Sequence, residues 1–121
     1  MKVAIYIRVG KKEQLEADKE IEIQRNELRD FCEKKKYQIV SEYVERRSGL
    51  EESQIIEELK RCIREKEILG VVVTDYAKIS RNVNSFMEFF DFMKENGVSL
   101  ESSVLDGKNI KKLDIDCFRK A

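Results

Sequence analysis

The feature that most constrains the fold is the run from Val3 to Val9, which is apolar or β-branched at almost every position and ends at Gly10. A strand that is apolar on both faces is typical of a parallel sheet covered by helices on both sides. Apolar runs recur at 37–45, 70–75 and 98–104, with a helical pattern between each pair. This alternation predicts an α/β fold with a central, mostly parallel sheet of four to five strands, flanked by helices.

Three segments between these runs have the apolar periodicity of amphipathic helices. We expect helices over 18–36, 53–66 and 84–96, the second capped by Ser53 and the third ended by Gly97. The aromatic stripe of the third helix is expected in the core rather than in a ligand pocket. The predicted inner faces consist of Ile21, Leu28, Phe31 and Cys32; Ile55, Ile56, Leu59, Cys62 and Ile63; and Phe86, Phe89, Phe90 and Met93.

The composition excludes several classes of function. The 121 residues include 24 Lys and Arg against 24 Asp and Glu, so no overall field draws the chain to nucleic acid or to a membrane. The chain contains no histidine, which excludes imidazole catalysis and most transition-metal sites. The three cysteines fit neither a disulfide framework nor a zinc knuckle. Without a membrane-spanning run, a signal peptide or a glycine-rich nucleotide loop, we expect a cytoplasmic protein with no metal and no cofactor.

Cations follow each of the first three predicted strands. In a parallel sheet these three loops lie at one edge, where ligands of open α/β sheets bind. Guanidinium groups suit phosphate, so the edge could bind an anion. A solvated surface with scattered salt bridges remains the other interpretation, since Glu13, Glu45 and Asp75 lie nearby. The cations are Arg8, Lys11 and Lys12 in the first loop, Arg46 and Arg47 in the second, and Lys78 and Arg81 in the third.

The motifs in this order resemble those of the serine site-specific recombinases, the family of resolvases, invertases and large serine integrases. Residues 6–14 (YIRVGKKEQ) resemble the family's opening motif, Y-x-R-V-S-T-x-x-Q, and residues 21–28 resemble S-I-x-x-Q-x-x-x-L. Residues 45–49 resemble its acid-x-x-S-G loop, and residues 71–82 its V-V-V-x-x-L-D-R-L-S-R-N motif. The resemblance covers about 105 residues, and residues 97–100 fit the strand that follows in the family.

The resemblance implies a domain whose serine attacks a DNA phosphodiester while arginines stabilise the developing charge, without a metal ion. The nucleophile position holds Gly10, which has no hydroxyl. The family's Asp-Arg pair is replaced by Ala77 and Lys78, and the arginine expected after the S-G loop is absent. Lysine keeps the charge but not the bidentate fork. By this resemblance, the positions expected to correspond to catalytic residues are Gly10 (the lost nucleophile position), Arg8, Gln14, Gln24, Lys78 and Arg81, and those expected to bind phosphate or DNA are Arg8, Arg46, Arg47, Ser48, Lys78 and Arg81.

We therefore expect a resolvase-like catalytic domain over 1–105, followed by a tail over 106–121 where the family's dimerisation helix begins, with no DNA-binding domain present. The domain is associated with DNA recombination and is expected not to cleave DNA. Two alternatives stay open: a regulatory or dimerisation module that pairs with a recombinase or another protein, and a phosphate- or DNA-binding domain without chemistry. We expect the chain to bind DNA weakly. We also expect it to form a homodimer or a hetero-oligomer with a recombinase.

Overall fold

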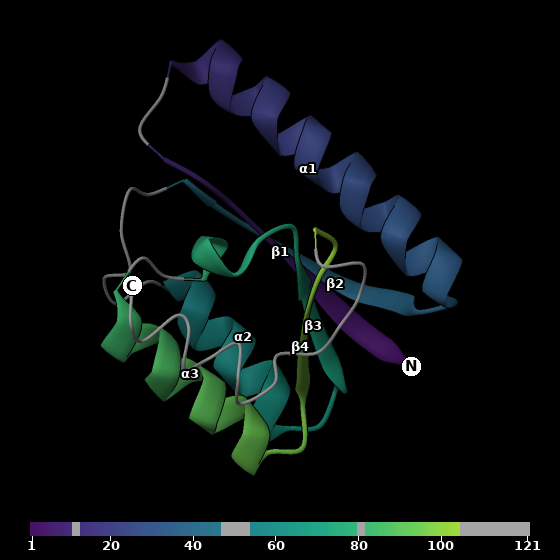
Figure 1. The fold of residues 1–121 in the computed structure, drawn as a ribbon, viewed down its shortest axis with the longest axis vertical. Helices are drawn as coiled ribbons and strands as arrows, with labels where there is room; N and C mark the ends of the chain where they lie inside the picture. The colour runs from purple at the N-terminus through teal and green to yellow at the C-terminus, as the bar shows by residue number, and fades with distance from the viewer. Residues whose placement is uncertain (11–12, 47–53, 80–81, 105–121) are drawn as a thin grey trace.

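Four parallel strands form one sheet in the order β2-β1-β3-β4, in a computed structural model that describes residues 1–10, 13–46, 54–79 and 82–104 (Figure 1). Each strand pairs in parallel with its neighbour, which confirms the predicted α/β class. The elements in chain order are β1 (Lys2–Val9), α1 (Gln14–Lys35), β2 (Gln38–Arg46), α2 (Gln54–Arg64), β3 (Gly70–Val73), the 3-10 turn η1 (Tyr76–Lys78), α3 (Val83–Glu95) and β4 (Ser99–Ser102).

Helix α1 covers one face of the sheet, and α2 and α3 cover the other (Figure 1). Strand β1 is central and apolar on both faces, so alternate residues enter different cores. Val3, Ile5, Ile7 and Val9 pack with the inner face of α1, whereas Ala4 and Tyr6 pack toward α2 and α3. The even-numbered face of β1 also carries Arg8, which therefore belongs to the α2 and α3 side.

The predicted inner faces are largely confirmed. All four predicted residues of α1 are buried, and four of the five predicted for α2 are buried as well. Ile55 and Phe90 are only partly buried and pack against the core from its margin. Gly97 lies in the left-handed region at φ 71 directly after the α3 cap, as expected of a residue that ends a helix.

Several predicted boundaries are wrong by a few residues. Helix α1 begins at Gln14 rather than at 18, because Gln14–Ala17 are good helix formers and Ala17 is buried beneath the helix. Helix α2 ends at Arg64, and Lys66 turns the chain at φ 60. Strand β3 ends at Val73, since the Asp75 side chain instead caps η1. Strand β4 is restricted to 99–102; Ser53 and the tail 106–121 lie outside the described residues.

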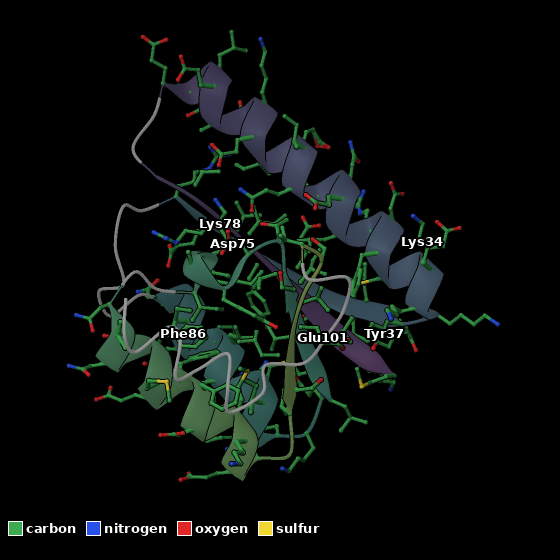
Figure 2. All side chains as sticks on the ribbon, viewed as in Figure 1. Lys34, Tyr37, Asp75, Lys78, Phe86 and Glu101 are labelled. Atoms are coloured by element: carbon green, nitrogen blue, oxygen red, sulfur yellow. The ribbon has the colours of Figure 1, made fainter. Side chains whose placement is uncertain are left out.

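A partly buried polar pair joins the segment that follows α1 to β4. The Tyr37 hydroxyl donates to Glu101 Oε1 at 2.9 Å, and Glu101 is 3% exposed (Figure 2). Burial first, and Glu101 second, raises the pKa of the nearby Cys32 thiol to about 11. Burial and the hydrogen bond to Glu101 raise the pKa of Tyr37 to about 12. Both groups are therefore neutral in the folded protein at ordinary pH.

Candidate functional site

The candidate site lies at the carboxyl edge of the sheet, where three chain segments meet. Gly10 follows β1, Arg46 ends β2, and η1 follows β3. Because all strands are parallel, these segments come to one edge, as the sequence predicted. Five residues of the predicted basic edge and site lie outside the described residues: Lys11, Lys12, Arg47, Ser48 and Arg81.

Arg8 binds backbone carbonyls of η1. Its Nε donates to the carbonyl of Lys78 at 2.8 Å, and its Nη2 donates to the carbonyl of Ala77 at 2.8 Å. The Arg8 residue is 6% exposed. From the other side, the backbone N–H of Ala77 donates to Asp75 Oδ1 at 2.8 Å. Arg8 and Asp75 thus hold η1 from two sides. Two of the five guanidinium N–H donors of Arg8 are used in these structural hydrogen bonds.

Gln24 connects α1 to the end of β1. Its Nε2 donates to the carbonyl of Arg8 at 3.1 Å and faces Glu20 Oε1 at 3.3 Å. The residue is 5% exposed, and its Oε1 accepts no hydrogen bond within the described part of the chain. A buried acceptor without a partner costs about 1–3 kcal/mol. Gln24 therefore lies against the end of β1 at this edge, and its catalytic role stays a prediction.

The remaining described cations of the predicted site each face a carboxylate of α1. Lys78 Nζ lies 3.7 Å from Glu20 Oε1, with both side chains about a quarter exposed (Figure 2 shows Lys78 on η1). Arg46 Nη2 lies 3.0 Å from Asp18 Oδ1, with both side chains about half exposed. Gln14 Nε2 also binds Asp18, at 3.2 Å, so this predicted site residue points along its own helix.

Asp18 and Glu20 are not among the acids that lie close to the cations in sequence. A sequence signal exists for Glu20, because it lies four residues before Gln24 and such pairs are neighbours on a helix surface. The position of both acids opposite the cations depends on how α1 packs over the sheet, which the sequence pattern does not specify.

A buried carboxylate lies beside Arg8 in the sheet. Glu45 pairs in register with Arg8 and is also 6% exposed. Its charge is felt by Tyr6, two residues along β1 and 1% exposed: burial raises the pKa of the Tyr6 hydroxyl strongly, Glu45 raises it further, and Arg8 opposes the rise. Among the described residues, the interior of the site therefore holds Arg8 and Glu45 side by side on neighbouring strands, both buried.

Gly10 is not crowded by the described part of the chain. A Cβ atom built on Gly10 meets none of the described residues within 4 Å, and the backbone there is not in the left-handed region. Neither packing nor backbone conformation therefore demands glycine at the end of β1. A serine side chain would fit this position, so the absence of a hydroxyl is a chemical difference rather than a steric necessity.

The comparisons with known proteins agree with this architecture. The family model described as "Resolvase, N terminal domain" matches residues 3–114. The chain therefore belongs to the resolvase family. No curated protein matched the chain.

Solved structures of recombinases are similar in fold. A resolvase family site-specific recombinase from Streptococcus pneumoniae is 26% identical with a TM-score of 0.81, and the match covers 99% of this chain and 84% of that one. The N-terminal catalytic domain of TP901-1 integrase is 19% identical with a TM-score of 0.78, covering 99% and 92%. The C-terminal catalytic domain of ISC1926 TnpA, an IS607-like serine recombinase, is 22% identical with a TM-score of 0.77, covering 85% and 70%. The fold is that of a serine-recombinase catalytic domain.

Among the described residues, no three His, Cys, Asp or Glu side chains gather in a group that could hold a metal ion. Among the helices described, none has the length and apolar character that crossing a membrane requires. The predictions of no cofactor, no metal and a cytoplasmic location stay predictions.

Proposed function

We propose that this chain is a recombinase catalytic domain that does not cleave DNA. The observation that carries the proposal is Gly10 at the end of β1, where the family motif has its serine and where no described residue would crowd a side chain. Covalent catalysis requires an oxygen that attacks the phosphorus and is regenerated later. A glycine provides none, and a hydroxyl elsewhere would lose the alignment that in-line attack requires.

The state of the surrounding cations supports the same proposal. A transition-state phosphate needs donors that are free to bind it. Arg8 instead donates two hydrogen bonds to backbone carbonyls, and the side chain at 78 is a lysine opposite Glu20. The positions of the family's Asp-Arg pair, Ala77 and Lys78, therefore offer their backbone carbonyls to Arg8.

We further propose that the domain works as a protein module, paired with an active recombinase or with a second copy of itself. The argument is that the family fold is retained, with a TM-score of 0.81 to a recombinase, while the chemistry at its edge is not. Copurification with a full-length family member would support this role. The other alternative, phosphate or DNA binding without chemistry, is less well supported, because three described cations of the edge already have partners.

The test of inactivity is a search for a covalent protein–DNA adduct. The parent chain, Gly10→Ser and the matched control Gly10→Ala are incubated with a random-sequence duplex library, quenched in denaturant, digested with nuclease and weighed by mass spectrometry. A triple variant, Gly10→Ser with Ala77→Asp and Lys78→Arg, restores the family's residues at all three positions. We expect no nucleotide adduct on the parent or on Gly10→Ala. An adduct on the parent chain would overturn the proposal.

A further inference from the structure

The first turns of α1 bring two carboxylates to two different loops of the candidate site. Asp18 reaches Arg46 at the end of β2, and Glu20 reaches Lys78 on η1. Residues two apart on a helix point about 200° apart, so the two acids leave α1 on opposite sides. Helix α1 therefore lies between the two loops at this edge, with one carboxylate turned to each.

The Glu20 contact is the better supported of the two. Glu20 and Lys78 are only 25% and 28% exposed, and Gln24 Nε2 lies 3.3 Å from the same Glu20 oxygen that faces Lys78. Gln24 is itself held by the carbonyl of Arg8. The outer pair, Asp18 and Arg46, is half exposed, and such a pair contributes little stability by itself. The importance of the Asp18 contact is its effect on local charge, because Asp18 neutralises Arg46 just as Glu20 neutralises Lys78.

We propose that Glu20 and Asp18 act as internal substitutes for DNA phosphate and keep Lys78 and Arg46 from the DNA backbone. Carboxylate and phosphate oxygens compete for the same ammonium and guanidinium donors. The internal carboxylates are always present, so DNA must displace them before it gains these two contacts. The role is one of specificity: the carboxylates of α1 disfavour DNA binding by Lys78 and Arg46 at this edge. The inference deepens the proposed function. It rests on one part of that proposal, the role of the domain as a protein module.

The test is DNA binding by fluorescence anisotropy on the full chain, with labelled mixed-sequence duplex at 50 and 200 mM salt. The test variant is Glu20→Gln with Asp18→Asn. Each phosphate contact changes the affinity with about the 0.9 power of salt concentration, which is about 3.5-fold over this range. Two released cations should therefore make the double variant about tenfold more salt-sensitive than the parent, and tighter than the parent at 50 mM. Circular dichroism verifies that each variant is folded.

The matched control removes the same charge elsewhere on α1, as Asp30→Asn with Glu33→Gln, both exposed. We expect less than a twofold change in this control, and we expect Lys78→Ala added to the test variant to remove part of the gain. Equal gains in the test and control variants, or no gain in the test variant, would overturn the inference. So would a parent chain whose salt-dependent binding is already weakened by Lys78→Ala. The covalent-adduct experiment is unaffected by any of these results, so the two proposals fail separately.

Discussion

Removal of the Arg8 side chain should destabilise the fold far more than removal of an arginine at the end of the neighbouring strand. Arg8 donates two hydrogen bonds of 2.8 Å to carbonyls of η1 from a position that is 6% exposed. A hydrogen bond that involves a charged group contributes about 1.5 kcal/mol or more, so Arg8→Ala should lower the free energy of unfolding by about 3 kcal/mol. A domain of ordinary stability, about 5–15 kcal/mol, would remain folded.

The assay is urea unfolding followed by circular dichroism, with Arg46→Ala as the control. Arg46 is half exposed and paired with an exposed carboxylate, so its loss should change the free energy of unfolding by no more than about 0.5 kcal/mol. With a slope of about 2 kcal/mol/M, Arg8→Ala should move the urea midpoint down by about 1.5 M. Arg8→Lys keeps the charge but not the fork, and should fall between parent and Arg8→Ala. Equal midpoints for Arg8→Ala and Arg46→Ala would refute the assignment of Arg8 as a structural clamp.

Two further predictions concern alkaline pH and glycine packing. The folded pKa values of about 11 for Cys32 and about 12 for Tyr37 exceed the ordinary values of 9.0 and 10.0, so these groups stabilise the fold fully below about pH 9, and that stability is lost as the pH rises to about 12. Thermal melts measured at a series of pH values check this. Tyr37→Phe removes the hydrogen bond to Glu101, so it should lower stability near pH 7 by about 1.5 kcal/mol and reduce the loss of stability at the alkaline end. A pH profile unchanged by this substitution would contradict the assignment. Gly70→Ala should lower the free energy of unfolding by about 1–2 kcal/mol, because its Cβ would meet side-chain atoms at 2.9–3.3 Å. Gly10→Ala should change the free energy of unfolding by no more than about 0.5 kcal/mol. Equal urea midpoints for the two variants would count against the packing argument.

The sequence was sufficient for the class of fold, because the apolar pattern depends on local periods. Val3–Val9 is apolar on both faces and becomes the central strand. Ile21, Leu28, Phe31 and Cys32 recur at helical spacing and are buried. Element ends were less predictable, because they depend on single side chains such as Asp75, which caps η1 instead of extending β3.

The candidate site was predictable in its location and not in its contacts. The parallel order of the strands brings Arg8 and Lys78 to one edge, and that much follows from the alternation of strands and helices. The direction of the Arg8 guanidinium depends on where η1 places its carbonyls, about seventy residues further along the chain. The pairing of Lys78 with Glu20 likewise depends on the packing of α1, which no local pattern encodes.

The central place of β1 in the sheet has a consequence for how the chain folds. Strand β1 precedes the other strands of this sheet along the chain and needs partners on both sides: Val3 pairs with Ile39 on one side and with Gly70 on the other. The nascent chain can join β1 to β2 early, but the opposite edge of β1 stays open until β3 has emerged. Pairing over such separations slows folding, and an open apolar edge can pair with other chains. The segment 54–69, which contains α2, therefore sets how long the growing chain is exposed to aggregation.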